Sequence, residues 1–76
     1  MNKARRAILN KIINGIQDLK NELESVKYEE EEAMENVPES LQDSDKYSAM
    51  EDAVDSMDNA RDELDDVIEY LESAMG

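Results

Sequence analysis

The sequence predicts an all-α fold, an antiparallel two-helix hairpin that forms a single domain of residues 1–76. In two long stretches the apolar residues recur at alternating steps of three and four, which is typical of a helix with one buried stripe. The only proline, Pro38, stands between these stretches. Because proline lacks an N–H and disfavours helix at the preceding residue, a turn is expected there. We therefore predict a helix over residues 2–36, a connection over 37–45 and a second helix over 46–75.

The first helix is predicted from a stripe of apolar side chains that leads into a run of acids. The stripe consists of Leu9, Ile12, Ile16, Leu19, Leu23 and Val26, followed by a polar break at Glu30 and by Ala33. Asn14-Gly15 can mark a hairpin turn, but the residues around it keep helical spacing, so the helix is expected to continue. Gly15 is then either tolerated, at about 1 kcal/mol relative to alanine, or the site of a kink or a close backbone approach. The acidic run of residues 29–32 is either a solvated surface or a site for a basic partner.

The second helix carries a longer stripe and an acidic opposite face. The stripe consists of Met50, Ala53, Met57, Ala60, Leu64, Val67, Leu71 and Ala74. The opposite face carries the carboxylates assigned to partner binding, which are Glu51, Asp52, Asp55, Asp58, Asp62, Asp65, Asp66, Glu69 and Glu72. This helix is therefore expected to pack against other helices while it presents carboxylates to solvent.

The apolar surface of this hairpin is wider than a single partner helix can cover. Three apolar positions in seven suit a helical bundle better than a two-stranded coil. We expect either that two hairpins pair into a dimeric four-helix bundle, or that one hairpin docks on another protein. The side chains assigned to self-association are Ile8, Ile13, Val54, Leu64, Ile68, Leu71 and Met75.

The composition argues against catalysis and against a bound cofactor. The chain has no cysteine and no histidine, so it lacks the usual thiolate and imidazole groups for nucleophilic catalysis or metal binding. None of its serines has a histidine to activate it, and two glycines are too few for a phosphate-binding loop. The calcium-loop pattern that begins at Asp43 fails at its sixth and twelfth positions, Ser48 and Val54. No enzyme activity, cofactor or metal is expected.

The charge is divided unevenly along the chain. The net charge is -13, with +3 in residues 1–27 and -16 in residues 28–76. Such a molecule should repel nucleic acid and anionic membranes and favour basic partners. No apolar run approaches the ~20 residues needed to cross a bilayer, and the absence of cysteine fits a cytoplasmic protein. Residues 3–16 could also form a transit peptide or a membrane-surface helix, but the acidic second half offers these cations a nearer partner.

The carboxylates of the second helix are dense enough to suggest a specific role. Ten acids lie between Glu51 and Glu72, which is about one charge per 3.3 Å of helix, against ~3.4 Å per charge in one strand of duplex DNA. One interpretation is an ordinary solubilising surface. The other is a nucleic-acid mimic that occupies a groove lined with lysine and arginine in a partner protein.

Five segments carry a resemblance to a known family: the opening Met1-Asn2-Lys3-Ala4-Arg5-Arg6, the acidic run of residues 29–32, the turn of residues 36–42, the segment of residues 49–53 and the segment of residues 68–72. In these segments the chain resembles a family of short, uncharacterised acidic helical proteins from phages and prophages of Gram-positive bacteria. The resemblance implies a phage setting, in which small acidic proteins often block host defence nucleases, as anti-CRISPR proteins do. It carries over no functional residue. We therefore expect a non-catalytic inhibitor of a host defence or nucleic-acid-handling protein, or else a structural adaptor module that only oligomerises.

Overall fold

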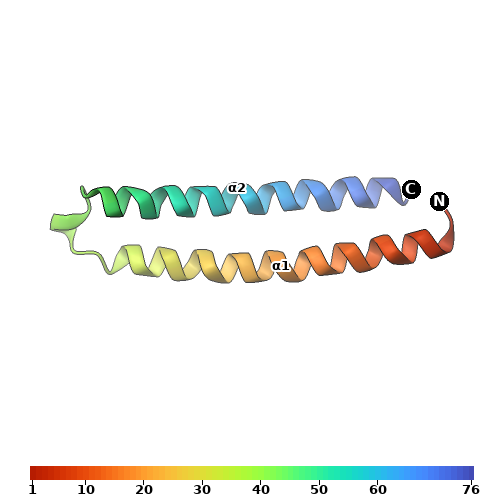
Figure 1. Ribbon diagram of the computed structural model, residues 1–76, viewed down its shortest axis with the longest axis horizontal. Helices are drawn as coiled ribbons and strands as arrows, with labels where there is room; N and C mark the ends of the chain where they lie inside the picture. Colours follow the sequence, from red (N-terminus) through yellow and green to blue (C-terminus); the bar gives the residue numbers. More distant parts are fainter.

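The computed structural model describes residues 1–76 and consists of two long α-helices joined by a short connection. Helix α1 spans Lys3–Glu35, the short 3-10 helix η1 spans Glu39–Leu41, and α2 spans Asp45–Ala74. The long helices run antiparallel and side by side, so that both termini lie at the same end (Figure 1). The Cα atoms extend over 59 × 15 × 12 Å. The prediction of an all-helical hairpin is confirmed, and each long helix begins and ends within one residue of its predicted bounds.

Local interactions at the helix ends account for these bounds. The Asn2 side chain accepts a hydrogen bond from the backbone N–H of Arg5 at 2.8 Å, and the Ser44 hydroxyl accepts one from the N–H of Tyr47 at 3.2 Å. Both residues therefore cap the free N–H groups at a helix start. Pro38 ends the first helical segment and opens η1, in which the N–H of Leu41 donates to the Pro38 carbonyl. Neither long helix contains a stretch apolar enough to span a lipid bilayer.

The side chains between the helices form two rows, which we call the inward rows. On α1 the inward row consists of Leu9, Ile13, Ile16, Lys20, Leu23, Lys27, Glu30 and Met34. On α2 it consists of Tyr47, Met50, Val54, Met57, Arg61, Leu64, Ile68, Leu71 and Met75. Only Ile13, Lys27 and Ile68 are buried, at 9%, 8% and 5% exposure, and the others are half-buried. The contact between the helices therefore buries few side chains compared with an ordinary domain core.

Half of each predicted stripe does not face the other helix, which corrects the sequence-based interpretation. Ile12, Leu19 and Val26 are 44%, 62% and 53% exposed, and Val67 of α2 is 41% exposed. Each helix is rotated so that its row of Ile13 or Ile68 faces the other helix instead. The row on α1 contains lysines, whose aliphatic stems can be covered while their ammonium groups reach carboxylates.

Gly15 does not interrupt α1, which is continuous through this position. A Cβ atom added to Gly15 would meet no other group of the chain within 4 Å. Within one hairpin, Gly15 is therefore a tolerated helical glycine and not a point of close backbone approach.

Candidate interaction surfaces

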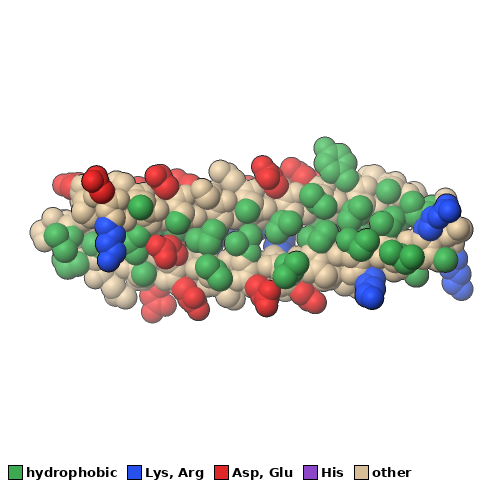
Figure 2. Space-filling model, in the orientation of Figure 1, with side chains coloured by type: hydrophobic (Ala, Val, Ile, Leu, Met, Phe, Trp, Pro, Cys, Tyr) green, Lys and Arg blue, Asp and Glu red, His purple; other side chains and the backbone are tan.

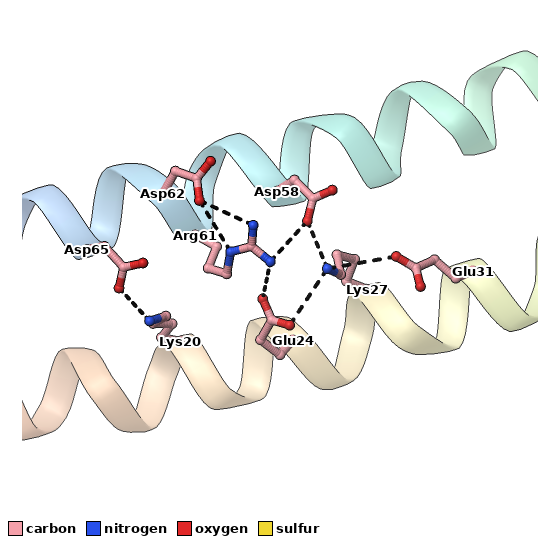
Figure 3. Close-up of polar contacts among 8 residues, drawn as sticks. All are labelled: Lys20, Glu24, Lys27, Glu31, Asp58, Arg61, Asp62 and Asp65. Carbon is pink, nitrogen blue, oxygen red and sulfur yellow. Dashed lines mark hydrogen bonds and ion pairs between the residues drawn. The ribbon is translucent and has the colours of Figure 1, made fainter.

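One long face of the hairpin carries an ion-pair cluster that joins the two helices (Figure 3). Its members are Lys20, Glu24, Lys27, Glu31, Asp58, Arg61, Asp62 and Asp65. Three pairs cross from helix to helix, namely Lys20 with Asp65, Lys27 with Asp58 at 2.8 Å, and Arg61 with Glu24 at 3.1 Å. All three cations belong to the inward rows, so the cluster fixes how each helix is rotated toward the other.

Hydrogen bonds within the cluster favour the charged forms of three of its groups, Lys27, Asp58 and Arg61. The hydrogen bond between Lys27 and Asp58 raises the pKa of Lys27 and lowers the pKa of Asp58. Hydrogen bonds to Asp62 and Glu24 raise the pKa of Arg61. No buried side-chain nitrogen or oxygen lacks a hydrogen-bond partner. The cluster therefore links α1 to α2 through charged contacts and leaves no buried polar atom unpaired.

Most of the carboxylates assigned to partner binding lie on the outside of α2. The exposed ones are Glu51, Asp52, Asp55, Asp62, Asp66, Glu69 and Glu72. Asp58 and Asp65 are half-buried and pair with lysines of α1, and Asp62 also pairs with Arg61. In the whole chain, five of the 21 carboxylates make ion pairs and sixteen make none. The surface of the hairpin therefore carries many negative charges without a partner in the chain.

The rows displaced from the helix contact form an apolar face, which the sequence had assigned to the interior. The apolar face consists of Ile12, Leu19, Val26 and Ala33 on α1 and of Ala53, Ala60, Val67 and Ala74 on α2, all of them exposed. Figure 2 shows hydrophobic side chains gathered along the line where the helices meet, from one end of the hairpin to the other. Most acidic side chains visible in this view lie along its outer edges.

The two rows of the apolar face open on the same side of the hairpin. Near the turn, Ala33 and Lys46 line one pocket, together with Val37 and Leu41. Because residues seven apart share a helix face, Ala33 continues the row of Val26, and Lys46 continues the α2 row. The cations of α1 in the ion-pair cluster lie about 100° further round the helix, next to Leu19 and Val26 in sequence. The hairpin therefore has an apolar long face and an ion-paired long face.

The side chains assigned to self-association lie mostly inside the hairpin. Ile13 and Ile68 are buried between α1 and α2, and a second copy could reach them only if the hairpin opened. Val54, Leu64, Leu71 and Met75 are half-buried in the inward row of α2, and Ile8 is exposed. Leu19 and Val67 could not be recognised as surface residues from their spacing, because the same spacing is typical of a buried stripe.

No family model, curated protein or solved structure matches this chain. No group of three or more acidic, histidine or cysteine side chains is arranged to hold a metal ion. The resemblance to acidic phage proteins stays a prediction. The carboxylates of α2, the ion-pair cluster and the apolar face are the features from which a function can be inferred.

Proposed function

We propose that this chain is a non-catalytic acidic protein-binding module whose exposed α2 carboxylates bind a basic surface of another protein. The observation that carries this proposal is the set of sixteen carboxylates that make no ion pair within the chain. Exposed like charges repel one another, and a cationic partner relieves that repulsion. Attraction between these carboxylates and the positive surface of the partner would also speed the association of the two proteins. It would make their binding sensitive to salt.

The role proposed first is inhibition of a host defence or nucleic-acid-handling protein by a phage-derived nucleic-acid mimic. Eight exposed acids lie between Glu51 and Glu72, because Asp58 and Asp65 point toward α1. They present about one charge per 4 Å of helix, which is close to the ~3.4 Å spacing of one DNA strand. The resemblance to phage proteins supports the same role. The natural partner would be a host protein with a basic groove, in the bacterial cytoplasm.

We also propose that the chain works as a homodimer in which two hairpins form a four-helix bundle. The exposed apolar face supports this assembly, because soluble monomers rarely leave a continuous apolar surface in water. Sedimentation equilibrium at micromolar concentration tests it directly. A fully helical monomer under those conditions would contradict the dimer without affecting the carboxylate proposal.

The binding proposal can be tested by neutralising carboxylates that take no part in the helix contact. We would change five exposed acids of α2 together to their amides: Glu51, Asp52, Asp55, Asp66 and Glu69. The fold should persist, because none of the five contributes to the ion-pair cluster. A host protein captured by the wild-type chain from a bacterial lysate should no longer be retained. Duplex DNA should release the same protein from the wild-type chain.

A matched control changes the net charge equally on another surface. Neutralising the exposed acids Glu29, Glu32, Glu35, Glu39 and Asp43 also removes five negative charges. This control should retain the partner if α2 carries the binding site. Equal loss in both variants would indicate a response to net charge alone, and full retention in the α2 variant would rule out mimicry.

The second candidate is a structural adaptor whose only task is oligomerisation. The apolar face favours it, because this face supports assembly whether or not the carboxylates bind anything. In that case the acidic surface only keeps the bundle soluble. Persistent self-association combined with no capture of a basic protein would favour this candidate over the inhibitor.

A further inference from the structure

We infer that the apolar face binds a second copy of the chain in antiparallel orientation, with the turn of each hairpin beside the termini of the other. This inference rests on the homodimer proposed above, and it names the surface and the direction of that dimer. It assigns self-association to the rows that contain Leu19 and Val67. The sequence had assigned it mostly to side chains that lie in the inward rows.

The area left exposed by one hairpin matches what a dimer would cover. The chain exposes 5722 Å², whereas a compact protein of 8.7 kDa is expected to expose about 4,700 Å². The excess of about 1,000 Å² is close to the ~800 Å² that each partner buries in a standard interface. A second copy placed along the 59 Å axis would therefore bring the exposed area near the value for a compact protein.

The composition of the face fits a copy of itself better than it fits a basic partner. Each row can be extended by seven residues toward the N-terminus, to Arg5 on α1 and to Lys46 on α2. The two extended rows contain ten residues and no acid. Acids make up 21 of the 76 residues of the chain, so between two and three would be expected among ten. Aspartate and glutamate are thus excluded from the one surface where a second hairpin would bury them. A cationic partner would gain nothing from a face without carboxylates.

The distribution of charge along the hairpin selects the antiparallel orientation. The half that contains the turn, residues 20–59, has 14 acids and 3 bases, a net charge of -11. The half that contains the termini, residues 1–19 and 60–76, has 7 acids and 5 bases, a net charge of -2. Parallel packing would place the two strongly negative halves against each other. Antiparallel packing sets each of them beside a nearly neutral half, which reduces the repulsion.

Energy transfer between dyes on different copies tests the orientation. The chain has no cysteine, so Ser40→Cys at the turn and Ser73→Cys near the C-terminus each give one labelling site on an exposed residue. A mixture of donor-labelled Ser40→Cys and acceptor-labelled Ser73→Cys should show efficient transfer. Donor and acceptor both on Ser40→Cys should show little, because the turns would lie nearly the full 59 Å apart. The reverse pattern overturns the antiparallel orientation, and no transfer in any mixture overturns the dimer.

A matched pair of substitutions tests the surface. Leu19→Glu places a charge at the middle of the apolar face and should weaken dimerisation by a factor of at least ~100 in sedimentation equilibrium. Asn21→Glu adds the same charge to an exposed position of the same helix and should leave the dimer affinity within a few fold. Leu19→Gln adds no charge, so its dimer should reform at higher concentration even if dilution lowers its helicity. A dimer of normal affinity in Leu19→Glu overturns this surface. Retention of the basic partner by Leu19→Glu is a separate measurement, because Leu19 and the carboxylates changed in the binding test lie in different rows.

Discussion

Lys27 shows how single side chains determine the packing of this hairpin. It is charged, yet it is one of the three buried residues. Its ammonium nitrogen lies 2.8 Å from Asp58, 3.7 Å from Glu24 and 3.8 Å from Glu31. Three carboxylates therefore replace the water that Lys27 loses. The neighbouring Tyr28 ring adds a further favourable contact, with its centroid 5.4 Å from the same nitrogen.

The first prediction concerns the pair formed by Lys27 and Asp58. Lys27→Met keeps an unbranched side chain of similar length and removes the donor that lowers the pKa of Asp58. We expect the pKa of Asp58 to rise toward its ordinary value, as followed by NMR titration of the side-chain carboxyl carbon. Lys46→Met removes a lysine that makes no ion pair and should leave the pKa of Asp58 unchanged. An unaltered Asp58 pKa in Lys27→Met would show that the hydrogen bond is unimportant.

The second prediction concerns Gly15. Gly15→Ala should raise the free energy of unfolding by about 1 kcal/mol, because alanine is the better helix former and the added Cβ meets nothing within 4 Å. Urea denaturation at fixed protein concentration measures this change. A destabilised variant would instead indicate that a second chain packs closely against Gly15.

At the level of the helices, the sequence was enough to predict the hairpin but not the rotation of each helix. The apolar steps and Pro38 indicate two helices and a turn, because both signals are local. With three apolar positions in seven, however, each helix offers two overlapping stripes. The choice between them depends on ion pairs between residues more than thirty positions apart, such as Lys27 with Asp58. Periodicity within one helix contains no information about such pairs.

The candidate surfaces were predictable to a similar extent. The exposed carboxylates of α2 follow from helical spacing, and seven of the nine assigned to partner binding are exposed. Asp58 and Asp65 could not be separated from the others, because their difference lies in the lysines of α1 opposite them. The apolar face was missed since lysine is rarely expected in a helix contact, although its long stem can pack there.

The third prediction concerns the contact between the helices. Ile68 is the least exposed apolar side chain, so Ile68→Ala should lower the free energy of unfolding by roughly 2–4 kcal/mol. Leu41→Ala is the matched control, because Leu41 is 55% exposed in the connection and should cost much less. Urea denaturation of both variants at one protein concentration gives the comparison. Equal losses would mean that the helices pack differently from the arrangement described.

At the level of the whole molecule, repulsion among carboxylates dominates the charge balance. The net charge is -13, and most of it lies in residues 28–76. Lowering the pH reduces the net negative charge and so relieves repulsion. The ion-pair cluster responds only at lower pH, because the folded protein lowers the pKa of Asp58 below its ordinary value of 3.8. The stability that Asp58 contributes is present above that value and is lost as the pH falls through the lowered pKa.

The fourth prediction is therefore that helicity holds or rises as the pH falls from 7 to about 5. Circular dichroism at constant ionic strength is the measurement. Lys27 responds in the opposite direction from Asp58 and loses its contribution to stability at high pH, because its pKa is raised above 10.5. Its contribution persists below 10.5 and is lost as the pH rises through the raised pKa. Sharp unfolding between pH 7 and 5 would show that ion pairs outweigh repulsion.

The position of the chain ends has a practical consequence for protein engineering. Both termini lie at one end of the hairpin (Figure 1), and a Cβ added to Gly76 would lie 3.8 Å from the Arg6 guanidinium. A short flexible linker could therefore join the ends into a circularly permuted chain that opens in the connection between η1 and α2. By the same geometry, the hairpin could be spliced into a surface loop of a carrier protein as a projecting arm. Its turn would then stand at the far tip, where a peptide epitope could be displayed.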